Sequence, residues 1–320
     1  MITASLLGAI LPTLFLVWLI WWADRYEREP VRMLAAAFLW GALPAILLAL
    51  ITELILTLPL PQTALWGQFA SMALVAPVVE ESVKGLALLG LLWFMRPEID
   101  GVLDGIVYGA LVGAGFAMTE NVFYFLGADG GGELSALIFL RAGVFGLNHI
   151  FYTAVFGASV GAAARMDHRG AQALTLTLGM AGAIGLHMLH NAATVLSQLS
   201  LGFILLSTLL LWSGLVVFLL LVILLLARER RIIREYLARE DAPAISEVER
   251  ARLMASLPPL ERFFPSFLLP EPAKKRAEVY QHVAELAFRR QRLARAQGQR
   301  AEDLAREMAV LREELDGLLG

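Results

Sequence analysis

The 320-residue sequence contains no cysteine, which excludes disulfide bonds and metal sites built from thiolates. Charged side chains are scarce over most of its length. Residues 1–227 hold 21 of the 55 charged residues, and residues 228–320 hold the other 34. The net charge of −3 does not by itself identify a partner, and we expect no nucleic-acid partner. The uneven distribution predicts a membrane domain over 1–227, followed by a soluble cytoplasmic tail over 228–320.

Apolar residues dominate what is present: 58% of the chain is hydrophobic, and the mean hydropathy is +0.67. A membrane-spanning helix needs ~20 mostly apolar residues. Runs of about this length lie at 3–22, 33–57, 67–95, 102–126, 135–163, 172–197 and 202–227. The first run lacks a basic start and a small-residue cleavage site, so we read it as a span rather than a signal peptide. The sequence predicts an all-α, polytopic membrane protein with about seven transmembrane helices and a helical tail.

Basic residues in the connecting segments predict the orientation in the membrane. The first, third and fifth loops and the segment after the last span hold eleven Arg residues, while the second, fourth and sixth loops hold no Lys or Arg. Cytoplasmic loops carry the excess of Lys and Arg in membrane proteins. We therefore expect a multi-pass protein of the cell membrane, with its N-terminus outside and its C-terminus in the cytoplasm.

Two patterns predict close helix packing. Glycines recur every fourth residue along the fourth run, at Gly101, Gly105, Gly109 and Gly113, and form a smooth ridge that lets a neighbouring helix approach. In the tail, apolar residues over 273–319 recur at alternating spacings of four and three. That spacing is typical of a helical hairpin or of a short coiled coil, so the tail is a candidate for self-association or partner binding.

Ionisable residues inside membrane spans are costly and usually functional. Glu80, Glu81 and Lys84 share the third run, and Lys84 lies one helical turn from both carboxylates. An ion pair that eases membrane insertion would explain one Glu and the Lys. It leaves the second carboxylate unexplained, and a buried carboxylate is suited to general acid or base catalysis.

Three further spans carry polar side chains to a similar depth. Glu120 lies on the fourth run, His149 on the fifth, and His187 and Asn191 share one face of the sixth. A helix rises ~1.5 Å per residue, which places these groups in the middle or outer half of the bilayer. Four spans thus converge on one candidate catalytic site. By contrast, Glu53 and Arg141 lie near the outer ends of their spans, and we interpret them as structural residues that snorkel or pair with each other.

The same motifs resemble the PrsW family of intramembrane proteases, within the superfamily that includes CAAX prenyl endopeptidases. The matching pieces are Glu80-Glu81-x-x-Lys84, Phe116-x-x-x-Glu120, the His149 motif, His187-x-x-x-Asn191 and the stretch from Asp24 to Pro30. The resemblance covers roughly residues 10–225. It implies cleavage of a membrane-embedded or membrane-proximal peptide bond in a membrane protein or peptide. In regulated proteolysis the substrate would be a membrane-anchored regulator such as an anti-sigma factor.

The resemblance leaves two mechanisms open. In a glutamic mechanism without a cofactor, Glu80 is the base, Glu81 and Lys84 orient it, and His149, His187 and Asn191 polarise the substrate carbonyl. In a zinc mechanism, His149, His187 and Glu120 bind Zn²⁺, and Glu80 or Glu81 is the base. The sequence contains no HExxH motif, and we favour the glutamic mechanism.

A proton-coupled transporter or channel is the main alternative function, because buried Glu and His residues also build proton relays. Transporters of this kind often show internal repeats, and we find none in the sequence. A third possibility, a seven-span receptor or scaffold, leaves the Glu, Lys and His residues unexplained.

Overall fold

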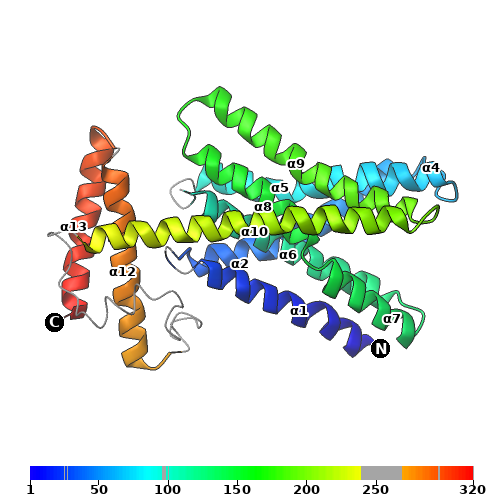
Figure 1. Ribbon diagram of the computed structural model, residues 1–320, viewed down its shortest axis with the longest axis horizontal. Helices are drawn as coiled ribbons and strands as arrows, with labels where there is room; N and C mark the ends of the chain where they lie inside the picture. Colours follow the sequence, from blue (N-terminus) through cyan, green and yellow to red (C-terminus); the bar gives the residue numbers. More distant parts are fainter. Residues whose placement is uncertain are drawn as a thin grey trace. The chain divides into compact units, whose positions relative to one another are not determined.

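A computed structural model describes residues 1–24, 26, 28–95, 99, 101–238, 269–294 and 296–319. All regular elements among these residues are helices, which confirms the predicted all-α class. The chain divides into two compact units (Figure 1). The first comprises Met1–Trp21 and Glu29–Leu219, and the second Trp22–Arg28 and Leu220–Gly320. Three Arg residues used to predict the orientation, at positions 25, 96 and 239, lie outside the described residues.

The helices of the first unit form long rods, several of them assembled from consecutive segments. They are α1 (Ile2–Ala23), α2 (Val31–Trp40), η1 (Gly41–Ala45), α3 (Ile46–Thr57), α4 (Leu65–Gln68), η2 (Phe69–Val75), α5 (Ala76–Phe94), α6 (Val102–Leu126), α7 (Gly131–Leu137), η4 (Ile138–Val144), α8 (Asn148–Ala164), α9 (Arg169–Leu196) and α10 (Gly202–Leu237). The segments η1, η2 and η4 are wider π-helical turns. In η1 the cause is local, because Pro44 has no N–H to donate to the regular ladder.

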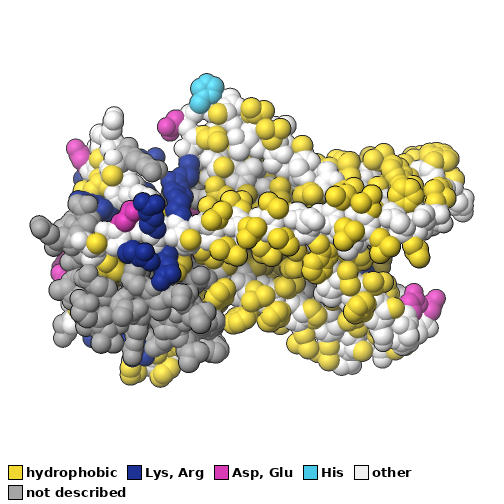
Figure 2. Space-filling model, viewed as in Figure 1, with side chains coloured by type: hydrophobic (Ala, Val, Ile, Leu, Met, Phe, Trp, Pro, Cys, Tyr) yellow, Lys and Arg dark blue, Asp and Glu magenta, His cyan; other side chains and the backbone are white. Residues whose placement is uncertain are grey.

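Six of the predicted spans are confirmed as helices long and apolar enough to cross a membrane. They are Ile2–Ala23, Val31–Thr57, Val102–Leu126, Gly131–Ala164, Arg169–Leu196 and Gly202–Leu237. The remaining predicted span is a continuous helical rod from Leu65 to Phe94, but it falls short in apolarity because it carries Glu80, Glu81 and Lys84. Its place as a seventh span stays a prediction. Apolar side chains spread over the surface of the helices in Figure 2, as contact with lipid requires.

Helix α6 is the centre of the first unit. In its most apolar stretch of 18 residues, 83% of the residues are buried. The glycine ridge explains how its neighbour comes so close. A Cβ atom on Gly105 would lie 2.0 Å from the Gly157 carbonyl oxygen, and one on Gly109 would lie 2.5 Å from that of Thr153. A Cβ atom on Gly113 would likewise lie 2.4 Å from the His149 carbonyl oxygen. The ridge therefore seats α8 directly on α6, and the contacted row of α8 includes His149.

The approach is reciprocal, because α8 contributes glycines of its own. A Cβ on Gly157 would lie 2.0 Å from the Gly105 carbonyl oxygen, and one on Gly161 would lie 2.0 Å from that of Gly101. Such backbone-to-backbone contact is typical of membrane helices joined through small residues. Polar side chains tie further spans together: Trp40 of α2 donates from Nε1 to the Val83 carbonyl of α5 at 3.0 Å.

The described residues of the tail hold the end of α10 and two further helices, α12 (Glu271–Leu293) and α13 (Gln299–Leu319), which pack against each other. The turn between them includes Gly298, whose positive φ of 56° suits glycine. Ion pairs between Arg289 and Glu307 and between His282 and Glu314 set the two helices antiparallel. The described part of the tail is thus the helical hairpin, one of the two arrangements that the apolar spacing predicts.

Replacement of Gly105 by alanine should destabilise the membrane unit, because the added Cβ meets the Gly157 carbonyl oxygen and α6 and α8 must separate. Forced overpacking of this kind costs about 1–3 kcal/mol. We expect a lower midpoint of thermal unfolding in detergent. The matched control is Gly90→Ala on α5, where nothing lies within 4 Å of the added Cβ. Equal midpoints for the two variants would contradict the packing assigned to the ridge.

Candidate active site

Side chains from four helical rods meet in one polar cluster. Helix α5 supplies Glu80, Glu81 and Lys84, α6 supplies Glu120, η4 and α8 supply Arg141, His149 and Thr153, and α9 supplies His187. The structure therefore brings together six of the residues that the sequence places in one site: Glu80, Glu81, Lys84, Glu120, His149 and His187.

Lys84 stands at the centre of the cluster and is fully buried. Its Nζ lies 3.1 Å from Glu80 Oε2, 2.8 Å from Glu81 Oε1 and 3.1 Å from His149 Nδ1. An ammonium group has three N–H donors, so these three acceptors satisfy it. The same nitrogen lies 3.8 Å from the centroid of the Phe116 ring, a favourable cation–π distance. Phe116 of the predicted Phe116-x-x-x-Glu120 motif thus forms one wall of the site.

The contact with Lys84 assigns the tautomer of His149. Nδ1 faces an ammonium that can only donate, so Nδ1 must accept, and the ring proton lies on Nε2. Nε2 lies 2.9 Å from Oε2 of Glu120, so this side of the ring faces a carboxylate. Both ring nitrogens of His149 are therefore engaged with protein groups, and the neutral imidazole links α5 to α6.

Glu81 is the most completely bound carboxylate of the three. Its Oε1 accepts from Lys84 and from Nδ1 of His187, the latter at 3.0 Å, and its Oε2 accepts from the Thr153 hydroxyl at 3.1 Å. The His187 ring also stacks on Tyr152, with centroids 5.0 Å apart. Because Nδ1 of His187 donates to Glu81, the nitrogen that remains available is Nε2, which has no hydrogen-bond partner in the described part of the chain.

Glu80 is less constrained than Glu81. Its Oε2 accepts from Lys84, whereas its Oε1 has no hydrogen-bond partner among the described residues. The side chain is 8% exposed, compared with 1% for Glu81. Glu80 is thus the carboxylate of the pair with a free oxygen to accept a proton.

Glu120 is held by Arg141, whose guanidinium lies 2.7 Å from its Oε2. Arg141 also donates from Nε to Asn121 Oδ1 at 2.9 Å. Arg141 thus pairs with Glu120 and not with Glu53, whose pairing with Arg141 was one of two structural roles that the sequence left open. The reason is the register of η4, which runs along α6 and places Arg141 beside the consecutive residues Glu120 and Asn121. Arg141 reduces the excess negative charge of the cluster, since two cations now face three carboxylates.

Asn191 shares the face of α9 with His187, as predicted, but its amide is used elsewhere. Nδ2 donates to the backbone carbonyl of Met72 in η2 at 2.8 Å. None of the hydrogen bonds found in the described residues connects Asn191 to the carboxylates. Its neighbour His190 packs against Phe145, with ring centroids 4.7 Å apart.

Glu80, Glu81, His149 and His187 could hold a metal ion, because their candidate ligand atoms all lie within 4.8 Å of one another. Imidazole nitrogens and carboxylate oxygens are the donors that Zn²⁺ takes in hydrolytic sites, so the chemistry of this set fits that ion. Glu120, one of the ligands expected from the resemblance, is not part of this set, and Glu80 and Glu81 take its place. A metal bound here would compete with the Lys84 ammonium for the same acceptors.

Thr153 and Arg141 are the site residues that sequence analysis did not assign. Thr153 follows His149 by four residues, so it shares the face of α8 that lies against α5, and that spacing was an available signal. Arg141 had no such signal. Its partners lie 20 and 21 residues earlier in the chain, and their pairing depends on how η4 lies along α6.

Comparison with known proteins gives one family. The family described as PrsW family intramembrane metalloprotease matches residues 29–227. Protease PrsW of Bacillus subtilis (strain 168) is 30% identical over 127 residues, which are 39% of this chain and 55% of that protein. Protease PrsW of Clostridioides difficile (strain 630) is 34% identical over 116 residues, 36% of this chain and 48% of that protein. The chain thus spans about half the length of the curated relatives it matches. No solved structure matches.

Substitution of Lys84 by methionine should severely destabilise the membrane unit, because it leaves Glu80 and Glu81 buried together without their cation. Removal of one partner from a buried ion pair typically costs about 3–5 kcal/mol. Lys84→Arg keeps the charge and is the matched control. We expect Lys84→Met to give little folded protein by size-exclusion chromatography in detergent, and Lys84→Arg to give clearly more. Equal yields of folded protein would show that the ammonium does not hold the cluster together.

Proposed function

The chain belongs to the PrsW family of intramembrane metalloproteases, and from that premise we propose that it is an endopeptidase that cleaves a peptide bond within or beside the membrane. The observation that carries the proposal is the free Oε1 oxygen of Glu80, held beside a fully bound Lys84 and Glu81. The cluster lies among predicted membrane spans, so its substrate is a membrane protein or a peptide that reaches membrane depth.

The proposed reaction begins with a water molecule that gives a proton to Glu80 Oε1 while its oxygen attacks the carbonyl carbon of the peptide bond. Glu80 then passes that proton to the leaving nitrogen, and the products are a carboxylic acid and an amine. Lys84 fixes the other oxygen of Glu80, which keeps the reacting oxygen directed outward. General base catalysis of this kind contributes about 10²–10⁴-fold to rate.

The roles of the remaining side chains are assigned from the atoms that are not already bound to another protein group. His187 has Nε2 free to interact with the substrate, since Glu81 holds its Nδ1. His149 uses both nitrogens on Lys84 and Glu120, which favours a positioning role over the carbonyl contact inferred from the resemblance. The Asn191 amide is hydrogen-bonded to the Met72 carbonyl, which favours a positioning role for Asn191 as well.

A zinc mechanism would use the same cluster. Glu80, Glu81, His149 and His187 are the residues that would hold the ion. When bound, Zn²⁺ acts as a Lewis acid that activates water and polarises a carbonyl. Lys84 would then neutralise surplus carboxylate charge. Nothing in the comparisons supports the transporter alternative.

We further propose that the substrate is a membrane-anchored regulator, such as an anti-sigma factor, and that the tail hairpin of α12 and α13 mediates self-association or partner binding. The proposed orientation, with the N-terminus outside and the C-terminus in the cytoplasm, is supported by the eleven Arg residues confined to alternate connecting segments.

Glu80→Gln should remove cleavage while leaving the protein folded, because glutamine keeps the volume and loses the base. We expect turnover of a membrane peptide in detergent to fall about 10²–10⁴-fold. Glu133→Gln, at an exposed position in α7, is the matched control and should cleave at the wild-type rate. Wild-type turnover by Glu80→Gln would remove Glu80 as the base and make Glu81 the candidate.

Metal removal distinguishes the two mechanisms in the same assay. In the glutamic mechanism, elemental analysis of the purified protein finds no stoichiometric metal, and a chelator leaves turnover unchanged. In the zinc mechanism, the protein carries about one metal ion per chain, His187→Ala loses it, and the chelator abolishes turnover.

Reporter fusions test the topology. A reporter inserted at Ala128, in the loop after α6, should report the outer side, and one fused at Gly320 should report the cytoplasm. The physical reason is that seven spans separate an outer N-terminus from an inner C-terminus. If both reporters signal from the same side, the seven-span arrangement is wrong.

A further inference from the structure

The fifth span is interrupted near its middle, immediately before the catalytic cluster. Within the rod from Gly131 to Ala164, η4 ends at Val144 and α8 begins at Asn148. The three residues between them form a turn. Non-helical backbone at membrane depth is tolerated only where it is buried in protein or lines a water-filled cavity. The turn therefore needs partners or a polar occupant.

Several backbone donors at this interruption have no partner. The Asn148 N–H donates to the Phe145 carbonyl at 2.9 Å, and the Phe151 N–H donates to that of Leu147 at 2.8 Å. No side chain caps α8. Over the part of the chain that the structure describes, no acceptor is found for the N–H groups of four residues around the start of α8, namely Gly146, Leu147, His149 and Ile150.

The side chain of Asn148 adds a second, independent observation. Asn148 is only 8% exposed, and its Nδ2 is buried with no hydrogen-bond partner among the described residues. Asn148 is the first residue of α8, so its side chain stands at the edge of the interruption. Asn148 also shares a face with Tyr152, one turn later, which stacks on the His187 ring. The unpartnered amide thus lies on the side of α8 that faces His187.

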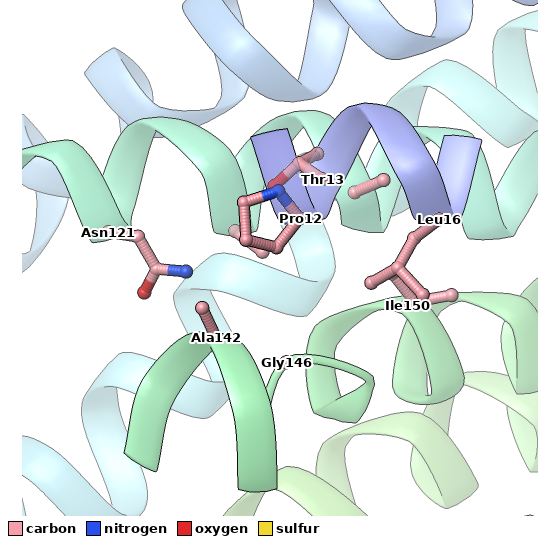
Figure 3. Close-up of a pocket in the computed structure, with 9 residues that line it drawn as sticks. Pro12, Thr13, Leu16, Asn121, Ala142, Gly146 and Ile150 are labelled. Atoms are coloured by element: carbon pink, nitrogen blue, oxygen red, sulfur yellow. The ribbon is translucent and has the colours of Figure 1, made fainter. Parts of the chain in front are cut away.

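The interruption is tied directly to the reacting groups through His149, and its α1 side borders a small cavity. His149 supplies one of the free backbone N–H groups, while its ring contacts Lys84 and Glu120. Figure 3 shows Gly146 and Ile150 at the edge of a small cavity that Asn121 of α6 also lines. Position 146 has no room for a side chain, because a Cβ there would lie 2.3 Å from the Ala142 carbonyl oxygen.

We propose that the start of α8 is the oxyanion hole of this protease, in which the Asn148 amide and the free backbone N–H groups beside it bind the carbonyl oxygen of the scissile peptide bond. The inference rests on the proposed peptidase function and names the group that binds its substrate. As the water oxygen bonds to the carbonyl carbon, the π electrons move to the carbonyl oxygen and the water proton moves to Glu80. When the carbon–nitrogen bond breaks, the electrons return from the oxygen and the proton passes to the leaving nitrogen.

Electrostatics favours this assignment. The start of a helix carries a partial positive charge, and backbone N–H groups without partners point along its axis. Donors fixed before the reaction stabilise developing negative charge most effectively where water is excluded. The donor role that the resemblance assigned to Asn191 thus passes to Asn148, whose amide is free.

Kinetics of Asn148 variants test the proposal. Asn148→Leu removes the donor at similar volume, and Asn148→Asp removes it with the same shape. We expect kcat to fall about 10²–10³-fold in both, with a small change in KM. The thermal midpoint of Asn148→Leu should equal or exceed that of the wild type, because an unpartnered buried amide is lost. A wild-type kcat in Asn148→Leu, or losses of activity that follow a lower midpoint, would overturn the proposal.

Hydrogen exchange gives a readout that does not require turnover. In Glu80→Gln protein, residue-resolved NMR should find faster amide exchange at 146, 147, 149 and 150 than at 153–159. A synthetic single-span peptide with a central Gly-Gly pair should slow that exchange. Slow exchange without the peptide, or no effect of the peptide, would overturn the oxyanion hole. If wild-type protein cleaves no peptide while this protection is present, the proposed function fails and the carbonyl-binding site stands.

Discussion

A single buried ammonium group organises the polar centre of this protein. Lys84 is fully buried and shares its three protons among Glu80, Glu81 and His149. Two of those acceptors contact further groups, because Glu81 holds His187 and Thr153 while His149 faces Glu120. In a low-dielectric interior, carboxylates this close together need such a cation. The same contacts that make the charges tolerable also set the orientation of every group proposed to act in hydrolysis.

Helix packing supplies the precision that this network needs. The glycines of α6 meet the backbone of α8 at Gly157, Thr153 and His149, which are successive positions of one row. Two of those residues, His149 and Thr153, also send side chains into the polar cluster. A bulkier residue on the ridge would therefore move catalytic groups as well as loosen two helices. The interface and the site share the same stretch of α8.

Much of this arrangement can be predicted from the sequence. The contacts that cannot be predicted have one physical reason in common. Hydropathy identified six helices that are long and apolar enough to cross a membrane, and polar residues within the runs identified the groups that meet. Spacing alone could not give the partner of Arg141, because that contact depends on the π-helical register of η4. Nor could it give the contact of Asn191 with Met72, which lies 119 residues away. Periodicity predicts which face a residue occupies, whereas contacts between distant segments follow from how whole helices pack.

The charges on α5 have a consequence for how the protein is made. During synthesis Lys84 emerges 65 residues ahead of His149 and Glu81 emerges 106 residues ahead of His187, so these histidines cannot help α5 to enter the bilayer. A charged residue at the centre of a helix opposes insertion by about 2.5–3.5 kcal/mol. Only the local contacts of Lys84 with Glu80 and Glu81, one helical turn away, are available at that stage. In the predicted seven-span arrangement, Lys84 accompanies two acidic groups into the membrane before the rest of the site exists.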